Sequence, residues 1–158
     1  MTERPVENVW DYPRPPSIER RDEHLVVRLG GQVIADTTMS WRVCETSHPP
    51  TYYLPVESFV AGVLRPVAGT TVCEWKGAAA YFDLVSSGRT VGSAAWSYPR
   101  PNERFENLVD HVAIYPGKVD ECTIDGEIVQ AQEGDFYGGW ITSRVSGPFK
   151  GAPGTLGW

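Results

Sequence analysis

Glycine and proline residues cut the chain into short runs, and this limits the fold more than any other feature of the sequence. The 158 residues include 16 glycines and 13 prolines, and both residue types interrupt regular elements. The runs between them are rich in aromatic and β-branched residues, which favour strands. The sequence therefore predicts one mainly β domain in which turns join many short strands.

Two dipeptides mark tight hairpins. Gly30-Gly31 separates the β-rich runs 25–29 and 32–36, and Asp125-Gly126 separates two later runs of the same kind. A two-residue type I′ turn needs a positive φ at both central residues, which these residue types tolerate. We therefore expect antiparallel strand pairs at both places.

One segment has helical rather than strand spacing. Its apolar residues recur at i, i+1, i+4 and i+5, which places them on one face of a helix; they are Phe59, Val60, Val63 and Leu64. Pro55 suits the first turn of such a helix, where its missing N–H costs no hydrogen bond. The sequence predicts one short helix over 55–64 and antiparallel sheets elsewhere, arranged as a sandwich or as two sheets meeting at an angle.

The two ends of the chain differ in composition from the middle. Residues 1–23 are rich in proline, which excludes regular helix and removes strand hydrogen bonds. Residues 131–158 are rich in glycine and end in Trp158. We expect an extended arm over 1–23, a core domain over 24–130, and a C-terminal tail over 131–158 that packs on the core.

Charge and hydropathy exclude several classes of function. The chain has 14 basic and 20 acidic residues, a net charge of -6, and no basic stripe of the kind that nucleic-acid-binding proteins carry. Its longest apolar runs, such as 78–82, fall far short of the ~20 residues of a membrane span. The first ten residues are too polar for a secretory signal. We expect a cytoplasmic protein that binds neither nucleic acid nor a membrane.

Cysteine and histidine residues are too scattered to predict a metal site. Cys44, Cys73 and Cys122 are odd in number and form no C-x-x-C pair, and the three histidines lie in separate segments. The sequence predicts free thiols in a reducing compartment, no metal and no cofactor. A nucleophilic role for Cys73 beside Lys76 is a weaker alternative, because no histidine stands next to it in sequence.

Several short motifs occur in an order that resembles the domain of unknown function 427 family. The resemblance covers roughly residues 24–130, and the glycine-rich tail resembles that of single-domain bacterial members. The motifs are Val33-Ile34-Ala35-Asp36-Thr37, Glu45 with Pro50-Thr51-Tyr52-Tyr53-Leu54-Pro55, Cys73-Glu74-Trp75-Lys76-Gly77-Ala78, Ala95-Trp96-Ser97-Tyr98-Pro99 and His111-Val112-Ala113-Ile114-Tyr115.

The resemblance implies a β-tent-like fold, in which antiparallel sheets lean together over a pocket. It implies little about activity. A nucleotidyltransferase label is sometimes attached to the family, but such enzymes hold magnesium on paired carboxylates after a Gly-Ser turn. Here no paired aspartates follow Gly88-Arg89. Zinc-binding β-tent relatives use paired cysteines that this chain lacks.

Aromatic residues from separate segments are candidates for the wall of a ligand pocket. Trp96 and Tyr98 alternate with small residues and so share one face of their strand. Tyr53, Trp75 and Tyr115 could meet them and form an apolar pocket with polar handles. The alternative is ordinary aromatic core.

Two charged residues are candidates for the chemistry of that pocket. Lys76 lies in a turn and could project into a cleft as a point charge, while Gly77 would let the backbone approach a ligand closely. Glu45 follows an apolar strand, and a carboxylate beside aromatic walls could act as a general acid or base. The alternatives are a solvated lysine at a hairpin tip and a carboxylate that fixes the turn at His48.

These observations support three hypotheses about function. The first is a domain that binds a small, polar or anionic and partly aromatic ligand through Tyr53, Trp75, Lys76, Gly77, Trp96 and Tyr98. The second is an enzyme in which Glu45 carries a proton and Lys76 stabilises charge. The third is a protein-interaction module that uses the tail. The absence of a complete triad or cofactor fingerprint favours the first.

Overall fold

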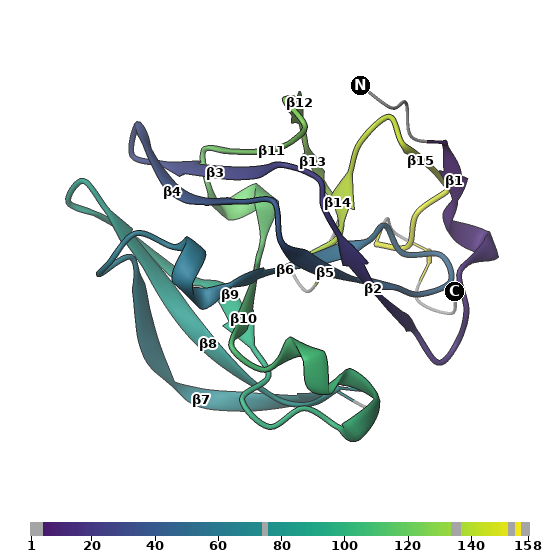
Figure 1. Cartoon of the computed structure of the whole chain (residues 1–158), viewed down its shortest axis with the longest axis horizontal. Helices are drawn as coiled ribbons and strands as arrows, with labels where there is room; N and C mark the ends of the chain where they lie inside the picture. The colour runs from purple at the N-terminus through teal and green to yellow at the C-terminus, as the bar shows by residue number, and fades with distance from the viewer. Residues whose placement is uncertain (1–4, 74–75, 134–136, 152–153, 156–158) are drawn as a thin grey trace.

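The computed structural model describes residues 5–73, 76–133, 137–151 and 154–155, and most of the regular structure in them is antiparallel strand (Figure 1). This confirms the predicted fold class. The strands are β1 (Glu7–Asn8), β2 (Ser17–Arg21), β3 (Leu25–Leu29), β4 (Gln32–Thr37), β5 (Ser40–Cys44), β6 (Thr51–Pro55), β7 (Leu64–Cys73), β8 (Gly77–Ser86), β9 (Arg89–Ser97), β10 (His111–Ile114), β11 (Glu121–Ile124), β12 (Glu127–Ile128), β13 (Gln130–Ala131), β14 (Trp140–Ile141) and β15 (Val145–Ser146). Four 3₁₀ turns join them: η1 (Val9–Asp11), η2 (Val56–Ser58), η3 (Glu103–Leu108) and η4 (Pro116–Lys118).

Two antiparallel sheets form the body of the molecule. The larger has seven strands in the order β2-β5-β6-β10-β9-β8-β7, and the smaller has four in the order β12-β11-β3-β4. In Figure 1 the smaller sheet lies above the larger one, whose long strands β7 and β8 curve away beneath it. Two short pairs, β1 with β15 and β13 with β14, involve the two ends of the chain.

Both predicted hairpins are present with the expected backbone. Gly30 and Gly31 have φ of 64° and 77°, and Asp125 and Gly126 have 49° and 85°. Two positive φ angles define the type I′ turn, whose twist matches that of the strands it joins. The first turn joins β3 to β4, and the second joins β11 to β12.

The predicted helix over 55–64 is wrong. Only Val56–Ser58 turn, as a single 3₁₀ turn. Phe59 then makes an isolated antiparallel bridge to Ala35, and Leu64 begins strand β7. The apolar residues of this segment therefore face the core as extended chain, and tertiary contacts with β4 and β8 override the helical spacing.

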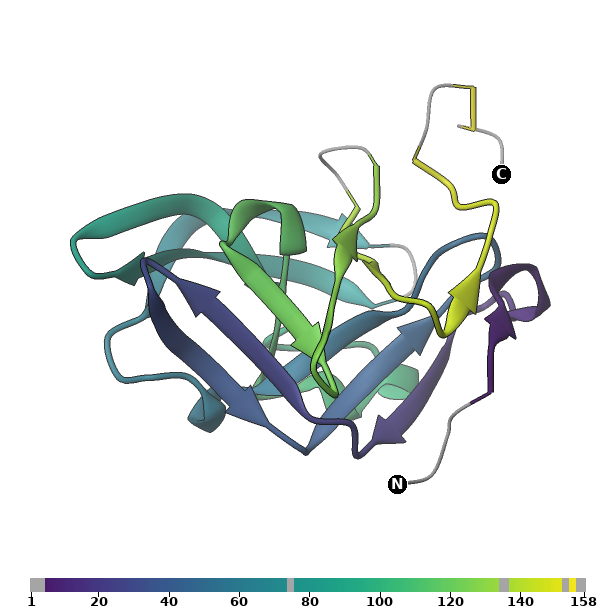
Figure 2. The ribbon, with the colours of Figure 1, turned by 90° about the horizontal axis from the view of Figure 1, so that it is seen from above.

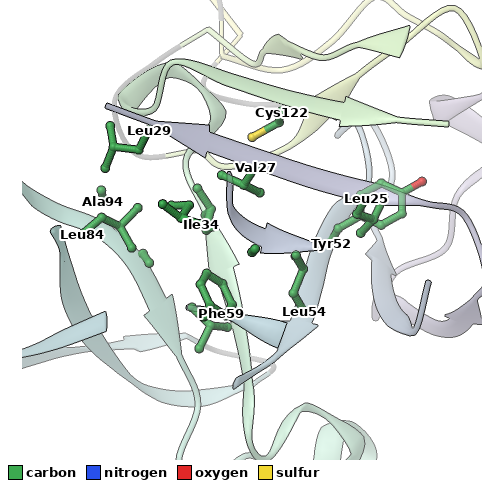
Figure 3. Packing of buried hydrophobic residues seen from close by; sticks show 14 of the residues in the cluster. Leu25, Val27, Leu29, Ile34, Tyr52, Leu54, Phe59, Leu84, Ala94 and Cys122 are labelled. Atoms are coloured by element: carbon green, nitrogen blue, oxygen red, sulfur yellow. The ribbon is translucent and has the colours of Figure 1, made fainter. Parts of the chain in front are cut away.

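The main core lies between the two larger sheets (Figure 3). The smaller sheet contributes Leu25, Val27, Leu29 and Ile34, all of which are fully buried. Leu54, Leu84 and Ala94 meet them from β6, β8 and β9 of the larger sheet. Burying one such leucine or isoleucine contributes about 1.5–3 kcal/mol, so this layer is the main source of stability.

A second apolar cluster covers the other face of the seven-stranded sheet. It contains Tyr53, Trp96 and Tyr98, together with Phe105 and Leu108 of η3. Neighbouring strand residues point to opposite faces, so Tyr52 enters the main core while Tyr53 enters this cluster. The second face therefore carries the aromatic residues singled out in the sequence.

The two ends of the chain lie side by side on the body. Residues 17–21, within the proline-rich segment, form β2, the edge strand that pairs with β5. Before it, β1 runs parallel to β15 (Figure 2). Trp10 donates its indole N–H to the carbonyl of Pro148 at 2.7 Å. Trp140 of the tail is buried in the main core, where it contacts Tyr52 at 5.3 Å between ring centroids.

Cys44 and Cys122 are buried free thiols. Burial raises the pKa of the Cys44 thiol to about 12, and it also raises that of Cys122. Neither residue has the exposed thiolate that a nucleophile needs. The Cys73 side chain, the sequence candidate for that role, lies outside the described part.

Among the residues that the structure describes, no helix is long and apolar enough to cross a membrane.

Candidate functional site

The second face of the large sheet carries a pocket of about 310 Å³. Strands β5, β6, β8 and β9, together with Tyr115 just after β10, form its floor, and the C-terminal tail forms one wall. Its lining is aromatic and charged: Val43, Glu45, His48, Pro49, Thr51, Tyr53, Lys76, Tyr81, Trp96, Tyr98, Tyr115, Gln132, Tyr137, Gly138 and Lys150. A volume of this size is at the lower end of the range for small-molecule sites.

Packed aromatic rings make the floor of the pocket rigid. Trp96 is 8 % exposed and lies 4.4 Å from the ring of Tyr115. Tyr53 meets Trp96 edge-on at 6.3 Å and lies 6.2 Å from Tyr98. These are preferred aromatic separations, each contributing about 0.5–1.5 kcal/mol beyond burial. The rings are therefore held in place before any ligand arrives.

Tyr115 provides a neutral hydroxyl at this floor. Burial, helped by the neighbouring Tyr81, raises the pKa of Tyr115 to about 12. Its hydroxyl group therefore keeps its proton at neutral pH, and it is hydrogen-bonded to Tyr81.

Two lysines bring positive charge to the pocket. The Lys76 ammonium lies 5.8 Å from the centre of the Tyr98 ring, and the Lys150 ammonium lies 5.9 Å from that of Tyr137. Both distances are within the range of cation–π attraction. Lys76 lies in the β7–β8 turn, and Lys150 lies in the C-terminal tail.

Glu45 is the acidic group of the lining, and its charge is already opposed. Its Oε2 lies 3.6 Å from Nε of Arg14 and 4.0 Å from Nε2 of His48. The Glu45 side chain is 25 % exposed. The carboxylate is balanced by Arg14, so the two lysines give the described part of the lining an excess of positive charge.

His48 is held as one neutral tautomer by Gln132. The Gln132 amide is oriented by two backbone partners, because its Oε1 accepts from the Gly139 N–H at 3.1 Å and its Nε2 donates to the Lys150 carbonyl at 2.7 Å. The second hydrogen of Nε2 then points to Nδ1 of His48, 3.3 Å away. An amide N–H can only donate, so Nδ1 accepts and the proton of the neutral imidazole lies on Nε2.

The surroundings of His48 keep the imidazole neutral. Burial, followed by the positive charges of Lys150, Arg14 and Lys76, lowers the pKa of His48 to about 4. Desolvation and like charge both disfavour the imidazolium. At neutral pH His48 therefore presents an uncharged Nε2–H.

Five residues predicted as site candidates lie together in this pocket: Glu45, Tyr53, Lys76, Trp96 and Tyr98. Gly77 has a φ of 107°, and its backbone faces the Arg100 carbonyl rather than the pocket, with a Cβ position 3.2 Å from that oxygen. Trp75 lies outside the described residues.

Sequence reasoning missed the residues that the tail and the 47–50 turn contribute. These are His48, Gln132, Tyr137 and Lys150. No spacing connects them, since residues 48 and 150 meet only through long-range contacts such as the backbone hydrogen bond from Lys150 to Ser47 at 2.8 Å. The one available signal was the pairing of aromatic and basic residues in a glycine-rich tail.

A second cavity of about 160 Å³ lies where the arm, the tail and the large sheet meet. Charged side chains line it, and they pair with one another or with neighbours. Arg21 binds Glu23 at 2.8 Å, Arg42 binds Glu7 at 3.0 Å, and Arg144 binds Asp125 at 2.9 Å. Because these charges are matched, this network serves to fasten the two ends of the chain.

Within the described ranges, no group of three or more histidine, cysteine, aspartate or glutamate side chains is placed to hold a metal ion.

Comparison with protein families matches residues 17–125 to the family described as "Domain of unknown function (DUF427)". The matched segment runs from β2 to β11 and contains Glu45, Tyr53, Lys76, Trp96 and Tyr98. Gln132, Tyr137 and Lys150 lie beyond it. A comparison with curated proteins gave no match.

Proposed function

Since the chain belongs to the DUF427 family, whose description assigns no activity, we propose its function from the pocket itself: the protein binds a small molecule that joins a flat unsaturated ring to an anionic group. The observation that carries this proposal is the meeting of Lys76 and Lys150 over a floor of packed aromatic rings.

The aromatic floor favours a flat ring. Trp96 and Tyr98 are buried, and Tyr115 and Tyr137 line the same pocket. Flat rings of a ligand stack on such surfaces or meet them edge-on with a favourable quadrupole interaction. A saturated ring of the same size is thicker and lacks this interaction.

The charges favour an anion. The whole chain has a net charge of -6, yet the cations Lys76 and Lys150 line this pocket, and Glu45, the one carboxylate among the described lining residues, faces Arg14. A local excess of positive charge on an acidic protein attracts negative ligands and disfavours positive ones. The neutral Nε2–H of His48 adds a donor that an anion can accept.

A proton-transfer enzyme is the second candidate. The observation in its favour is that Glu45 Oε2 lies 4.0 Å from His48 Nε2 at the edge of the same pocket. A small shift on ligand binding would bring this carboxylate within reach of a substrate proton. Turnover of a bound compound that is lost in Glu45→Gln, with binding retained, would favour this candidate over simple binding.

Binding can be tested with probes that differ in one feature at a time. We expect phenyl phosphate to raise the melting temperature, and to raise it further with the logarithm of its concentration above Kd, since a ligand that binds only the folded state stabilises it. Cyclohexyl phosphate, which lacks the flat ring, and aniline, which lacks the anion, are expected to do so far less. Equal effects of all three would contradict the proposal.

A charge-removal pair tests the role of the lysine. Lys76→Met is expected to weaken phenyl phosphate binding by about ten- to a hundredfold, as the loss of one charge-assisted contact costs about 1.5–3 kcal/mol. Arg104→Met is the matched control, because Arg104 is exposed on η3 outside the pocket lining. Equal weakening by both variants would show that general charge attraction, not the pocket, binds the probe.

A further inference from the structure

We propose that the tail residues Gln132 and Lys150 determine which anionic group the pocket accepts, selecting a phosphate monoester dianion over a monovalent carboxylate. This inference rests on the proposed function and names the ligand class of the same pocket. Both residues lie outside the matched segment 17–125, so the tail adds this selectivity to a pocket floor that the family supplies.

The tail is fixed firmly enough for this role. Trp140 is 1 % exposed in the main core, and its backbone N–H donates to Pro50 at 2.8 Å. Gly138 lies directly against the indole of Trp96, since a Cβ at this position would stand 2.1 Å from Cη2. The backbone of Lys150 is tied to Ser47 at 2.8 Å. These contacts leave little freedom to the wall that carries Lys150.

Gln132 sets the hydrogen-bonding character of His48. Gln132 is itself 5 % exposed, and its amide has partners on both sides, Gly139 and Lys150. With Nδ1 of His48 occupied by the amide N–H, the other ring nitrogen, Nε2, is a donor; it lies on the side of Glu45 Oε2, 4.0 Å away. His48 can therefore bind an acceptor such as a phosphate oxygen, and it cannot accept a proton from a hydroxyl group at that position.

The donors match a dianion better than a monoanion. Lys76 and Lys150 bring two positive charges, and His48 brings a neutral donor. A phosphate monoester has two negative charges near neutral pH and three acceptor oxygens, whereas a carboxylate has one charge and two. A monovalent group would neutralise only one of the two ammonium charges, so it would gain less electrostatic attraction than a dianion.

Gln132 is thus a positioning residue, and its effect on the tautomer of His48 can be measured without any ligand. Nitrogen-15 NMR of the full chain labelled in histidine distinguishes the protonated from the unprotonated ring nitrogen. We expect Nδ1 of His48 to be the unprotonated one. In Gln132→Glu the carboxylate accepts instead of donating, so the proton is expected to move to Nδ1. An unprotonated Nε2 in the wild-type protein would overturn the proposal, even if the variant failed to fold.

Affinity for two probes tests the selection. We expect the wild-type protein to bind phenyl phosphate at least tenfold more tightly than benzoate, and Lys150→Met and Gln132→Glu to reduce that preference to less than threefold. Ser146→Ala, an exposed change in the same tail, is the control and should keep the preference. An unchanged preference in both variants would overturn the proposal while leaving the proposed function standing. Failure of the wild-type protein to bind either probe would instead refute the proposed function, and the selection with it.

Discussion

Replacing Gly138 by alanine is the sharpest steric test of how the tail meets the pocket. The new Cβ would stand 2.1 Å from Cη2 and 2.9 Å from Cζ3 of Trp96, well inside contact distance. The indole cannot turn aside, because Tyr115 lies 4.4 Å from it on one side and Tyr53 meets its edge. The tail backbone therefore has to move away from the sheet.

The expected cost follows from two opposing effects. Overpacking a fitted contact costs about 1–3 kcal/mol, while alanine restricts the unfolded chain more than glycine and returns about 0.4–1 kcal/mol. We expect Gly138→Ala to lower the free energy of unfolding by about 1–2 kcal/mol. The phenyl phosphate affinity should fall as well, since the wall carrying Lys150 shifts with the backbone.

Urea unfolding followed by circular dichroism measures the stability difference, with Gly92→Ala as the matched control. A Cβ on Gly92 in β9 would meet only Asp83 Oδ1, at an ordinary 3.8 Å, and Gly92 is not among the residues with positive φ. The control therefore lacks the clash and should not lose stability. Equal or greater stability of Gly138→Ala than of the wild-type protein would refute the contact between tail and indole.

Three further outcomes follow from the packing and the charges. Trp140→Ala should lower the free energy of unfolding by about 3–5 kcal/mol in urea titrations, whereas Trp10→Ala, at a side chain 40 % exposed, should cost less than about 1 kcal/mol. Because burial lowers the pKa of His48 to about 4 against 6.5 in the unfolded chain, its stabilising contribution is present above pH 6.5 and is lost as pH falls toward 4. Unfolding at pH 5 should need about 2 kcal/mol less than at pH 7, and His48→Gln should remove that difference. Burial raises the pKa of Glu7, but hydrogen bonds led by that from Arg42 lower it by more. This carboxylate therefore stabilises the fold above about pH 4.5 and loses that effect in acid. Arg42→Met should lower the free energy of unfolding at pH 7 by about 1–3 kcal/mol and weaken its pH dependence below 4.5.

The parts of the fold that local chemistry decides could be predicted from the sequence. Gly30-Gly31 and Asp125-Gly126 predict their hairpins because few other residue pairs tolerate two positive φ angles. The sequence alone could not show that the predicted helix over 55–64 is wrong. Its apolar spacing fits a helix, and only the partners Ala35 and Leu84 show that Phe59 and Leu64 pack as extended chain.

Some residues of the candidate pocket could be predicted from the sequence, and others could not. Trp96 and Tyr98 share a face by strand alternation, and Lys76 lies at a turn between long strands. The sequence could therefore predict that these residues line one pocket. His48 and Lys150 meet only after the tail has crossed the sheet, and Gln132 joins them through one amide. Contacts over such separations leave no periodic trace in the sequence.

The paired tyrosines of β6 have a consequence for how such a protein can diversify. Tyr52 and Tyr53 are neighbours in sequence, yet one packs in the main core against Trp140 and the other forms part of the pocket floor. Changes at position 53 act on the second apolar cluster and on the pocket that it lines, and changes at position 52 act on the core between the sheets. Two neighbouring positions of one strand are therefore under different selection: mutations at 52 change the packing between the sheets, and mutations at 53 change the shape of the pocket floor together with the packing of its rings.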